Sequence, residues 1–312
     1  MQYAPPYSEI IVADNASTDN SVVFLKMHYP EIRIIQNNEN GGFAKGYNDA
    51  LKQIDSEYYC LLNSDVEVTE HWVEPIIHLL DNHPEVAVVQ PKLLSYFNKE
   101  QFEYAGASGG FIDFLGYPFC RGRVFEHLEK DTGKYDEATE VFWATGAALF
   151  VRSEVFHKVN GLDEDFFAHM EEIDFCWRVK SLGYKIMVEP KSVIYHVGGG
   201  TLPKNNSRKT YLNFRNNLFL LLKNLPKNKL FPILFIRFPL DQIAALFFLF
   251  QGHWNDTWAV FRAQLSFMRQ CCKMKRKRNH INKQIYQQTF QKSIVFEHYI
   301  KKKNKFNGIN LE

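Results

Sequence analysis

The sequence contains few cysteines and no pattern that would pair them. Its 312 residues include five, an odd number, and they lack the spacing of a zinc site. This excludes a disulfide-stapled secreted scaffold and a zinc-finger module, and it fits a protein that works in a reducing cytoplasm. The cysteines are Cys60, Cys120, Cys176, Cys271 and Cys272.

Long uninterrupted apolar runs are also absent. The polar segment 1–7 has none of the apolar core of a signal peptide. Residues 230–250 are the one candidate for a membrane span, but their clean run, 243–250, is far shorter than the roughly 20 residues that a spanning helix needs. We therefore expect an interfacial or core pair of helices there. The interrupting residues are Pro232, Arg237, Pro239, Asp241 and Gln242.

A strong net charge is missing, yet the two parts of the chain differ sharply. The net charge is +2. Residues 201–312 contain 21 Lys and Arg against 4 Asp and Glu, which leaves 16 against 31 in residues 1–200. An acidic part suits metal binding and general-base chemistry, whereas a basic part suits an anionic surface such as lipid headgroups better than nucleic acid here. We expect a catalytic domain at 1–200 and a helical, basic, membrane-surface region at 201–312.

Internal repeats are absent, and short apolar runs alternate with helical segments instead. This alternation predicts an α/β fold with a mostly parallel central sheet and helices on both faces. From 93 to 140 the pattern fades into aromatic and glycine-rich sequence, which we expect to form loops that contact substrate. A boundary is expected near Gly198, Gly199 and Gly200. Strands are expected at 9–13, 32–35, 58–63, 86–90, 185–188 and 192–196, helices at 22–27, 43–54, 72–82 and around 171–178, and a core segment at 141–151.

An apolar run at 58–62 ends in Asn63, Ser64 and Asp65. Such a run, bounded by turn formers, favours a buried strand. Ligands in open α/β sheets collect at the carboxyl ends of strands, where a lone Asp can hold a divalent cation against phosphate oxygens. A plain turn or helix cap explains these three residues equally well on their own.

Two further residues follow strands. For Asp14 a helix N-cap is the simpler interpretation, and the alternative is a carboxylate that accepts hydrogen bonds from a nucleobase. Asp19 is expected to cap the helix or to stabilise the turn. For His196 the structural and metal-ligand interpretations are evenly matched.

Residues 40–48 resemble a phosphate-binding glycine turn, although their spacing is not that of a P-loop or a dinucleotide fingerprint. Gly46 falls inside an expected helix, where Gly costs about 1 kcal/mol relative to Ala. We infer close packing or the approach of a ligand at that position. Lys45 is expected to meet either a diphosphate or solvent.

Three carboxylates, Glu171, Glu172 and Asp174, fall within one helical turn. A solvated acidic face near a helix N-terminus is the ordinary explanation. Aromatic residues surround the cluster, however, and partial desolvation raises the pKa of a carboxylate, which suits a general base. Asp174 and Arg178 have the i, i+4 spacing of a structural pair. The aromatic residues are Phe166, Phe167, Phe175 and Trp177.

Together these segments resemble family 2 inverting glycosyltransferases, in particular the rhamnosyltransferases and galactofuranosyltransferases of cell-surface polysaccharide synthesis. The resemblance covers residues 8–200 strongly and the tail weakly. Six segments in order carry it: 10–19, 40–48, 61–65, 143–147, 166–178 and His196.

The resemblance implies a glycosyltransferase A fold and transfer of a sugar, with inversion, from a nucleotide-diphosphate sugar to a polyprenyl-diphosphate-linked or polysaccharide acceptor. It implies that Asp65 and His196 hold Mg2+ or Mn2+. It also makes Glu172 the general base, with Glu171 as the runner-up. The implied donor-binding residues are Asp14, Asn15, Gly42, Lys45, Asn48, Asn63, Ser64 and Asp65, and the implied acceptor-binding residues are Trp143, Thr145, Gly146, Asp174 and Arg215.

Two features depart from the family pattern. Relatives normally begin with one more strand and helix, whereas this sequence starts just before the second strand, so we expect an N-terminally truncated domain. Asn63 and Glu172 stand where the family usually has Asp, and the longer Glu side chain requires a small shift of its helix.

Two rival hypotheses remain open. One is an inactive, truncated, membrane-associated domain. The other is a sugar nucleotidyltransferase, which would be expected to carry a basic, glycine-rich phosphate loop near the first strand, where this sequence has none. For the leading hypothesis we expect a cytoplasmic enzyme that is peripheral on the inner face of the cell membrane, where Arg208, Lys209 and Arg215 would favour anionic headgroups.

Overall fold

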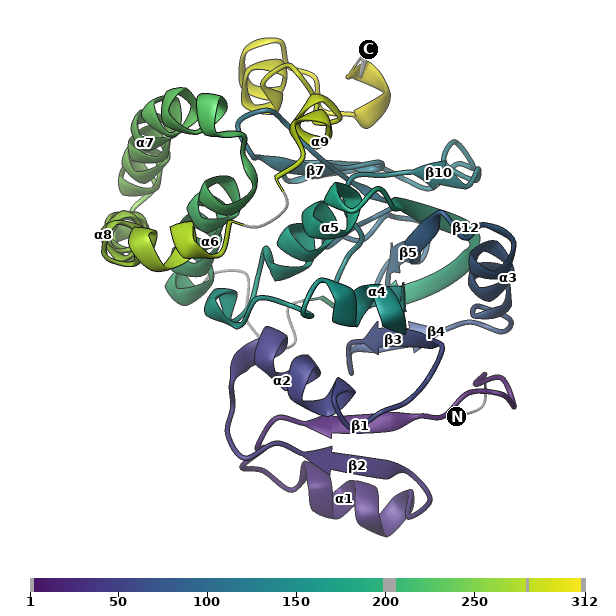
Figure 1. Ribbon diagram of the computed structural model, residues 1–312. Coiled ribbons are helices and arrows are strands. Elements are labelled where there is room, and N and C mark those ends of the chain that lie inside the picture. The colour runs from purple at the N-terminus through teal and green to yellow at the C-terminus, as the bar shows by residue number, and fades with distance from the viewer. Residues whose placement is uncertain (1–2, 199–205, 279–280, 310–312) are drawn as a thin grey trace.

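A computed structural model describes residues 3–198, 206–278 and 281–309 of the chain (Figure 1). The expected boundary at Gly198–Gly200 falls largely outside these ranges. The helices are α1 (Ser21–His28), α2 (Gly42–Leu51), α3 (Glu74–Asn82), α4 (Ser153–Lys158), α5 (Glu171–Ser181), α6 (Ser207–Asn224), α7 (Lys227–Phe250), α8 (Trp254–Arg276) and α9 (Lys283–Gln287), with short turns at Glu164–Phe166, Phe296–Ile300 and Phe306–Gly308.

The strands of the described residues form three sheets. Most of the expected strands and helices are confirmed to within about three residues. The exceptions are β5, which runs five residues beyond its expected end, the strands expected at 185–188 and 192–196, which are one strand, and the core segment, which is extended only at its end. The strands are β1 (Ile11–Asp14), β2 (Arg33–Gln36), β3 (Tyr58–Leu62), β4 (Val66–Val68), β5 (Val86–Ser95), β6 (Gly110–Ile112), β7 (Pro118–Cys120), β8 (Arg123–Val124), β9 (His127–Leu128), β10 (Thr139–Glu140), β11 (Ala148–Arg152) and β12 (Lys185–His196).

The central sheet has the order β10-β12-β5-β11-β3, and β4 adds to the end of β12. β5 and β12 are parallel, whereas β11 is antiparallel to both of its neighbours, β3 and β5. The three long strands β3, β5 and β12 therefore share one direction, and the sheet is mixed rather than mostly parallel. The reason is that β11 enters after the long segment 93–140, which does not supply the helical crossover that a parallel neighbour requires.

Helices cover both faces of this sheet, as predicted (Figure 1). β5 is buried over nine of its ten residues. On one face it packs under α3, through a cluster that includes Ile76, Leu80 and Val89. The other face packs under α5, through a cluster that includes Val88 and Trp177. A strand covered on both sides explains the continuous apolar run in its sequence.

Segment 93–140 is more ordered than expected. It contains β6, β7, β8 and β9, which form a four-stranded antiparallel sheet. The chain's last described segment packs against it: Phe290 N donates to Ile112 O (2.9 Å) and Phe306 stacks near Phe111 and Phe119. Buried aromatic side chains therefore dock this basic segment on the sheet.

α7 is one continuous helix of 24 residues, not the pair of helices expected from its prolines. Pro232 and Pro239 lie on its exposed side, so their rings project away from the domain. Of the described helices, α7 alone is long and apolar enough to cross a membrane by length and composition, with a mean hydropathy of 1.8. About 22% of that apolar window is buried inside the protein.

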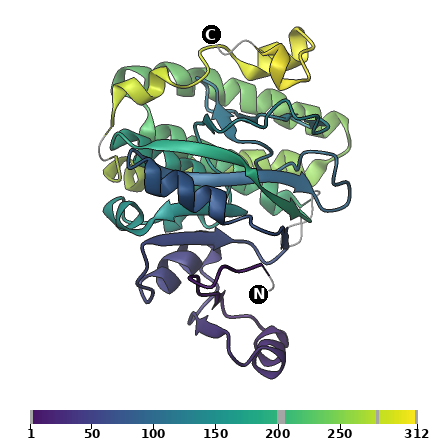
Figure 2. The same cartoon turned by 90° about the vertical axis from the view of Figure 1, so that its right-hand side faces the viewer.

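β1 and β2 form a separate two-stranded parallel sheet, joined by α1. In the described part of the chain, β1 pairs only with β2, and β3 pairs only with β11. The path of hydrogen-bonded strands is therefore interrupted between β1 and β3. Figures 1 and 2 show β2 and α1 projecting from one end of the body.

This arrangement predicts unequal local stability. α1 has no buried residue, and few buried contacts mean a low free energy of local opening. We expect the amides of α1 and β2 to exchange with deuterium at least about tenfold faster than those of β5 and β12. Hydrogen exchange followed by mass spectrometry measures this, and equal protection of both regions would contradict it.

Candidate active site

The ends of β3 and β12 meet through β4. Val66 of β4 pairs with His196 of β12, and Val197 N donates to Asp65 O (3.0 Å). This register brings Asp65 Oδ1 to 3.2 Å from His196 Nε2. Two residues that are 131 positions apart in the sequence, and that were both predicted to bind a metal, are therefore neighbours.

Glu103 completes this group, and nothing in the sequence pointed to it. Its Oε2 lies 3.3 Å from His196 Nδ1, on the side of the ring away from Asp65. Burial favours the neutral imidazole, but Glu103 and then Asp65 raise the pKa of His196 overall. A carboxylate on one imidazole nitrogen orients the ring so that the other nitrogen can face a cation.

The Asp65–His196 pair fits a divalent cation. Neighbouring ligands of an octahedral ion with bonds of about 2.1 Å lie about 3 Å apart, close to the 3.2 Å observed. No group of three or more His, Cys, Asp and Glu side chains suited to a metal occurs among residues 3–198, 206–278 and 281–309. A cation held here would take its other ligands from water or phosphate oxygens, as Mg2+ commonly does.

The predicted base lies directly after a strained loop. Phe167, His169 and Met170 have φ angles of 67°, 69° and 69°, in the left-handed region that residues other than glycine rarely adopt. Backbone of this kind persists only where its surroundings hold it, and it collects at functional sites. α5 begins at Glu171, immediately after it.

α6 supplies contacts that hold this loop. Asn216 is fully buried, and its side-chain amide lies within 2.9 Å of three loop carbonyls. Arg215 Nη2 donates to two carbonyls, at 3.0 and 3.1 Å. The C-terminal helical region is thus part of the support of the site. The acceptors are Phe166, Ala168 and His169 for Asn216, and Asp165 and Phe166 for Arg215.

Burial dominates the electrostatics of the two glutamates. It raises the pKa of Glu172 to about 7, against hydrogen bonds from backbone N–H groups at the start of α5. The pKa of Glu171 is raised well above its ordinary value by burial and by the neighbouring charge of Glu172. In both side chains Oε2 is buried without a hydrogen-bond partner among the described residues. A carboxyl group that titrates near neutral pH is suited to act as a general base.

Cys120 connects the two groups of residues. Its thiol is fully buried, and burial raises its pKa, with smaller contributions in the same direction from Glu103 and Glu172. Arg123 opposes these effects and lowers the pKa, and the charges of both carboxylates reach this one thiol. The support of the Asp65–His196 pair and the predicted base belong to one region of the fold.

The glycine turn packs beside the strained loop. Asn15 Nδ2 donates to Gly42 O (2.9 Å), and a Cβ at Gly46 would lie 3.0 Å from the same amide. The close packing inferred at Gly46 is confirmed. Gly42 has φ +79°, and a Cβ there would lie 2.4 Å from Phe167 O, so only glycine lets α2 start against that loop.

The other predicted donor-binding residues have identifiable partners. Asp14 is buried, and its Oδ1 accepts from Ser17 N (3.2 Å), whereas Asp19 accepts from Ser21 N at the start of α1, as a cap or turn residue would. Lys45 forms an ion pair with Asp49 of the same helix. That contact is a third possibility beside the diphosphate and solvent considered from the sequence.

Asn48 and the β3 terminus are also held in place. The Asn48 side chain donates to Leu162 O (2.8 Å) and accepts from Leu162 N (3.0 Å), so it joins α2 to the segment before the strained loop. Asn63 N donates to Ala147 O (3.0 Å), and Ser64 is exposed. Their roles in binding a donor remain predictions.

Asp174 corrects a prediction. It is fully buried, Oδ2 accepts from Arg178 Nε (2.8 Å) and Lys223 Nζ (2.7 Å), and Oδ1 accepts from Asn224 Nδ2 (2.8 Å). Burial opposes its ionisation, but Lys223 and Arg178 lower its pKa overall. The predicted pair with Arg178 is confirmed, and no surface is left for an acceptor.

Three other residues predicted to bind the acceptor are also packed. Trp143 is 4% exposed, donates from Nε1 to Phe111 O (2.8 Å), and lies against the backbone of Gly110. The structure thus covers the ring face that was expected to meet a sugar. Thr145 is 3% exposed and Arg215 is occupied by the loop carbonyls, whereas Gly146 is partly exposed.

Sequence reasoning missed three residues of the site: Glu103, His169 and Asn216. Burial lowers the pKa of His169 to about 4, with Lys209 acting in the same direction, so its ring is neutral at pH 7. Asn216 was given no role from the sequence. A buried Asn directly before a leucine-rich helical run was the available signal, because such an amide must find partners.

A mixed α/β sheet with carboxylate and imidazole groups at its strand ends is the architecture of an α/β protein that binds its ligand at one edge of the sheet. The family model described as Glycosyl transferase family 2 matches residues 2–158. The chain belongs to glycosyltransferase family 2.

Two curated relatives are similar at low identity. The chain is 22% identical over 202 residues to the N-acetylglucosaminyl-diphospho-decaprenol L-rhamnosyltransferase of Mycobacterium tuberculosis, over 60% of this chain and 66% of that protein. It is 24% identical over 219 residues to the low-salt glycan biosynthesis hexosyltransferase Agl10 of Haloferax volcanii, over 67% of this chain and 66% of that protein. The match thus spans just under two thirds of each relative.

Among solved structures, the chain resembles GalNAc-T7 with UDP, GalNAc and Mn2+. The TM-score is 0.53 at 12% identity, over 71% of this chain and 43% of that one. At this identity the likeness shows the fold alone, and it confirms the expected glycosyltransferase A fold with a C-terminal helical region.

Asn216 offers a test of the loop support. Asn216→Ala removes a buried amide and leaves the carbonyls of Ala168 and His169 short of a donor, whereas Phe166 O keeps Arg215; this costs about 1–3 kcal/mol of unfolding free energy. We expect urea unfolding to show a loss in this range. Asn255→Ala, at an exposed position of α8, is the control and should change stability by less than about 0.5 kcal/mol. Equal losses of stability in the two variants would contradict the role of Asn216 in holding the loop.

Glu172 makes a pH-dependent prediction. The pKa of Glu172 is about 7 in the folded protein and about 4.3 in an unfolded chain. The folded state therefore binds the proton more tightly, and the free energy of unfolding falls as the pH rises from 4.3 through 7. Glu172→Gln stays neutral, so we expect it to raise the melting temperature relative to the wild type at pH 8 and to have little effect at pH 4. Glu154→Gln, exposed on α4, is the control. An equal effect of Glu172→Gln at both pH values would contradict the raised pKa.

Proposed function

We propose that the protein transfers a sugar, with inversion, from a nucleotide-diphosphate sugar to a lipid-linked or polysaccharide acceptor in cell-surface glycan synthesis. The observation that carries this proposal is the paired Asp65 and His196 in the same region as a half-buried Glu172, whose Oε2 is buried without a partner and whose pKa is about 7. Membership of family 2 supports sugar transfer. The decaprenol-linked substrate in the name of the mycobacterial relative supports a lipid-linked acceptor.

In this proposal Asp65 and His196 hold Mg2+ or Mn2+, with Glu103 fixing the imidazole. The cation, when bound, neutralises charge on the departing nucleoside diphosphate. The Mn2+ in the GalNAc-T7 structure supports a divalent ion.

Glu172 acts on the acceptor. Its unpartnered Oε2 takes the proton of the attacking hydroxyl as the new bond forms between that oxygen and the anomeric carbon. The bond from that carbon to the diphosphate breaks, and its electron pair leaves with the diphosphate. Attack from the face opposite the leaving group inverts the anomeric centre. Glu171, whose Oε2 is also buried without a partner, is the alternative base.

A second candidate is a nucleotide-fold domain that has no activity. The interruption between β1 and β3 favours it, because the donor is expected to bind near that edge of the sheet. The two candidates differ in one measurable property: an inert domain shows no metal-dependent affinity for a nucleotide.

Calorimetric titration with UDP, dTDP and GDP, each with and without Mn2+, tests the proposal. We expect one nucleotide to bind, and Mn2+ to tighten its binding. Asp65→Ala should weaken the Mn2+-dependent binding by about 10–100-fold, the range for lost metal-site interactions. Glu172→Gln is the matched control: it should bind the nucleotide normally and lose about 10²–10⁴-fold in turnover.

Three outcomes would contradict the proposed function or the roles of its residues. Binding of none of the nucleotides would favour the inert domain. Unchanged Mn2+ dependence in Asp65→Ala would remove Asp65 from the metal site, and retained turnover in Glu172→Gln would move the base to Glu171.

A further inference from the structure

The exposed side of α7 is apolar along its length. Every exposed residue of this helix from 231 to 250 is apolar. The side chains of Phe231, Phe235 and Phe250 are 77%, 72% and 87% exposed. A patch of this kind on a folded domain marks an interaction site. The exposed residues are Phe231, Pro232, Phe235, Ile236, Pro239, Ile243, Leu246, Phe247 and Phe250.

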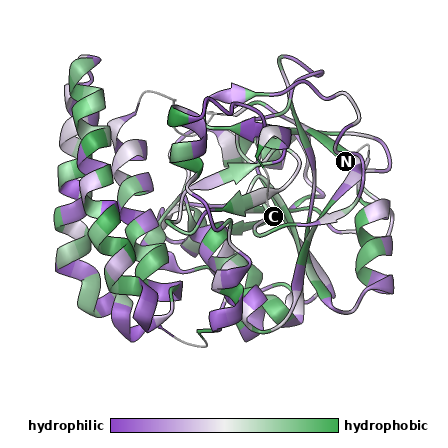
Figure 3. Ribbon diagram, turned by 90° about the horizontal axis from the view of Figure 1, so that it is seen from above, coloured by the Kyte–Doolittle hydropathy of each residue, from purple (hydrophilic) through white to green (hydrophobic). Residues whose placement is uncertain are grey.

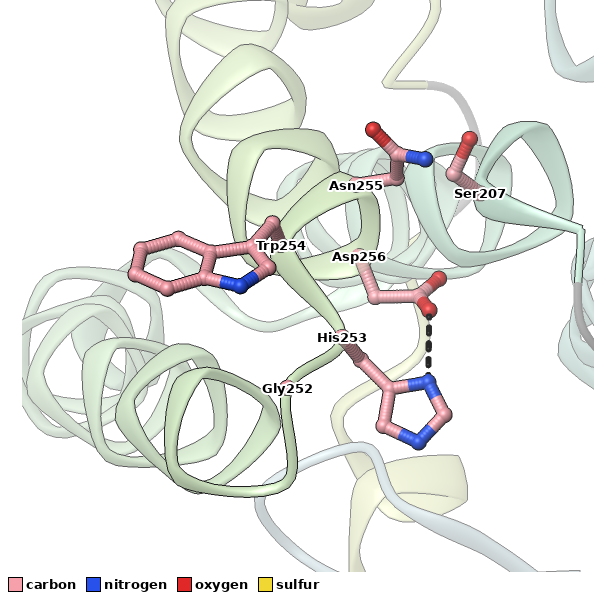
Figure 4. A pocket seen from close by; sticks show the side chains of 6 residues that line it. All are labelled: Ser207, Gly252, His253, Trp254, Asn255 and Asp256. Atoms are coloured by element: carbon pink, nitrogen blue, oxygen red, sulfur yellow. Dashed lines mark ion pairs between the residues drawn. The ribbon is translucent and has the colours of Figure 1, made fainter.

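α8 extends this surface and adds positive charge. Trp254 and Trp258 are 70% and 61% exposed, followed by further apolar side chains. Figure 3 shows hydrophobic residues recurring along these outer helices, and Figure 4 shows Trp254 at the α7–α8 turn, pointing away from the ion pair of His253 and Asp256 (3.7 Å). The further exposed apolar residues of α8 include Phe261, Leu265 and Met268, and its exposed basic residues are Arg262, Arg269, Lys273, Lys275 and Arg276; Asn255 and Cys272 are also exposed.

The acidic side chains of α7 and α8 do not lie on this exposed surface. α7 and α8 contain two acidic residues, Asp241 and Asp256. Asp241 is fully buried, and Asp256 is half-buried and accepts from Thr210 Oγ1 (2.6 Å). The exposed charge on these two helices is therefore entirely positive. Two copies of such a face would repel each other, whereas an anionic surface would attract it.

The buried side of α7 fixes the orientation of the helix. Ile233, Arg237, Asp241 and Ala245 recur at every fourth position and are buried. Arg237 donates to Leu115 O (2.7 Å) and pairs with Asp241 (3.1 Å). The Arg237 guanidinium thus ties this side of α7 to the domain, which lies along the helix. A helix held along its side in this way presents one long face to a partner.

We propose that the outer face of α7 and α8 docks on an anionic membrane surface, with α7 lying in the plane of the lipid interface. Apolar side chains flanked by Trp and by Lys or Arg, without exposed acids, are the composition of interfacial helices. In this proposal the membrane surface is the cytoplasmic face of the cell membrane. If the proposed function holds, on which this step rests, the docking brings the active site to a lipid-linked acceptor.

Vesicle flotation of the full chain tests the docking. We expect binding to phosphatidylcholine–phosphatidylglycerol vesicles, at least about fivefold weaker to pure phosphatidylcholine vesicles, and weakened by added salt. Phe231→Ser and Phe250→Ser should each lower the vesicle affinity by about tenfold. Phe97→Ser is the matched control, because Phe97 is also 77% exposed but lies outside α7 and α8, and it should bind as the wild type does.

Several outcomes would overturn the docking. They are no flotation of the wild type at low salt, equal flotation of Phe231→Ser and Phe97→Ser, or a stable dimer that Phe231→Ser converts to a monomer. Resistance to alkaline carbonate extraction would overturn the in-plane orientation in favour of a span. Nucleotide titration of the same preparations separates this proposal from the proposed function, since neither substitution touches Asp65, His196 or Glu172.

Discussion

The buried ion pair between Asp174 and Lys223 joins the catalytic part of the chain to its C-terminal helices. Lys223 is 3% exposed and also pairs with Asp163, which in turn pairs with Lys277 of the segment after α8. Removing one partner of such a pair leaves an uncompensated buried charge. In other proteins this typically lowers the free energy of unfolding by about 3–5 kcal/mol. The loop that precedes Glu171 depends on this docking, because Asn216 and Arg215 lie on the same helix as Lys223.

The opposite charges of the two parts of the chain therefore have an internal use. Of the five cations in the basic run 273–278, Lys273 and Lys277 pair with acidic residues of the catalytic part, and Arg278 donates to carbonyls of Leu222 and Leu225. Lys275 and Arg276 remain exposed. Composition alone predicted an anionic surface as the partner of the basic part, whereas in the structure some of its charges dock the helices and others lie on the outer surface.

The elements that the sequence predicts well are those whose signal is local. Apolar runs and turn residues placed β3, β5 and the helices around them. The same pattern put Asp65 and His196 at strand ends, which the structure confirms, and their role as metal ligands stays a prediction. Long-range partners carry no local signal. Glu103 reaches His196 across 93 positions of the sequence, the direction of β11 follows from a long connection, and Trp143 became buried because Gly110 lets the backbone approach its ring. Prolines suggested a break in α7, but their exposed positions allow one continuous helix.

α6 lies between the strained loop and the outer helices. On one side Asn216 holds the loop carbonyls, and on the other Tyr211 OH donates to Ser266 Oγ (2.9 Å) of α8 and Thr210 donates to Asp256. One helix thus contacts both the segment that carries the proposed base and the helices that carry the exposed apolar face. Since left-handed backbone at Phe167, His169 and Met170 needs continuous support, the positions of Glu171 and Glu172 depend on how α6 is packed. A catalytic half separated from these helices would lose that support, so the C-terminal region is structurally inseparable from the site.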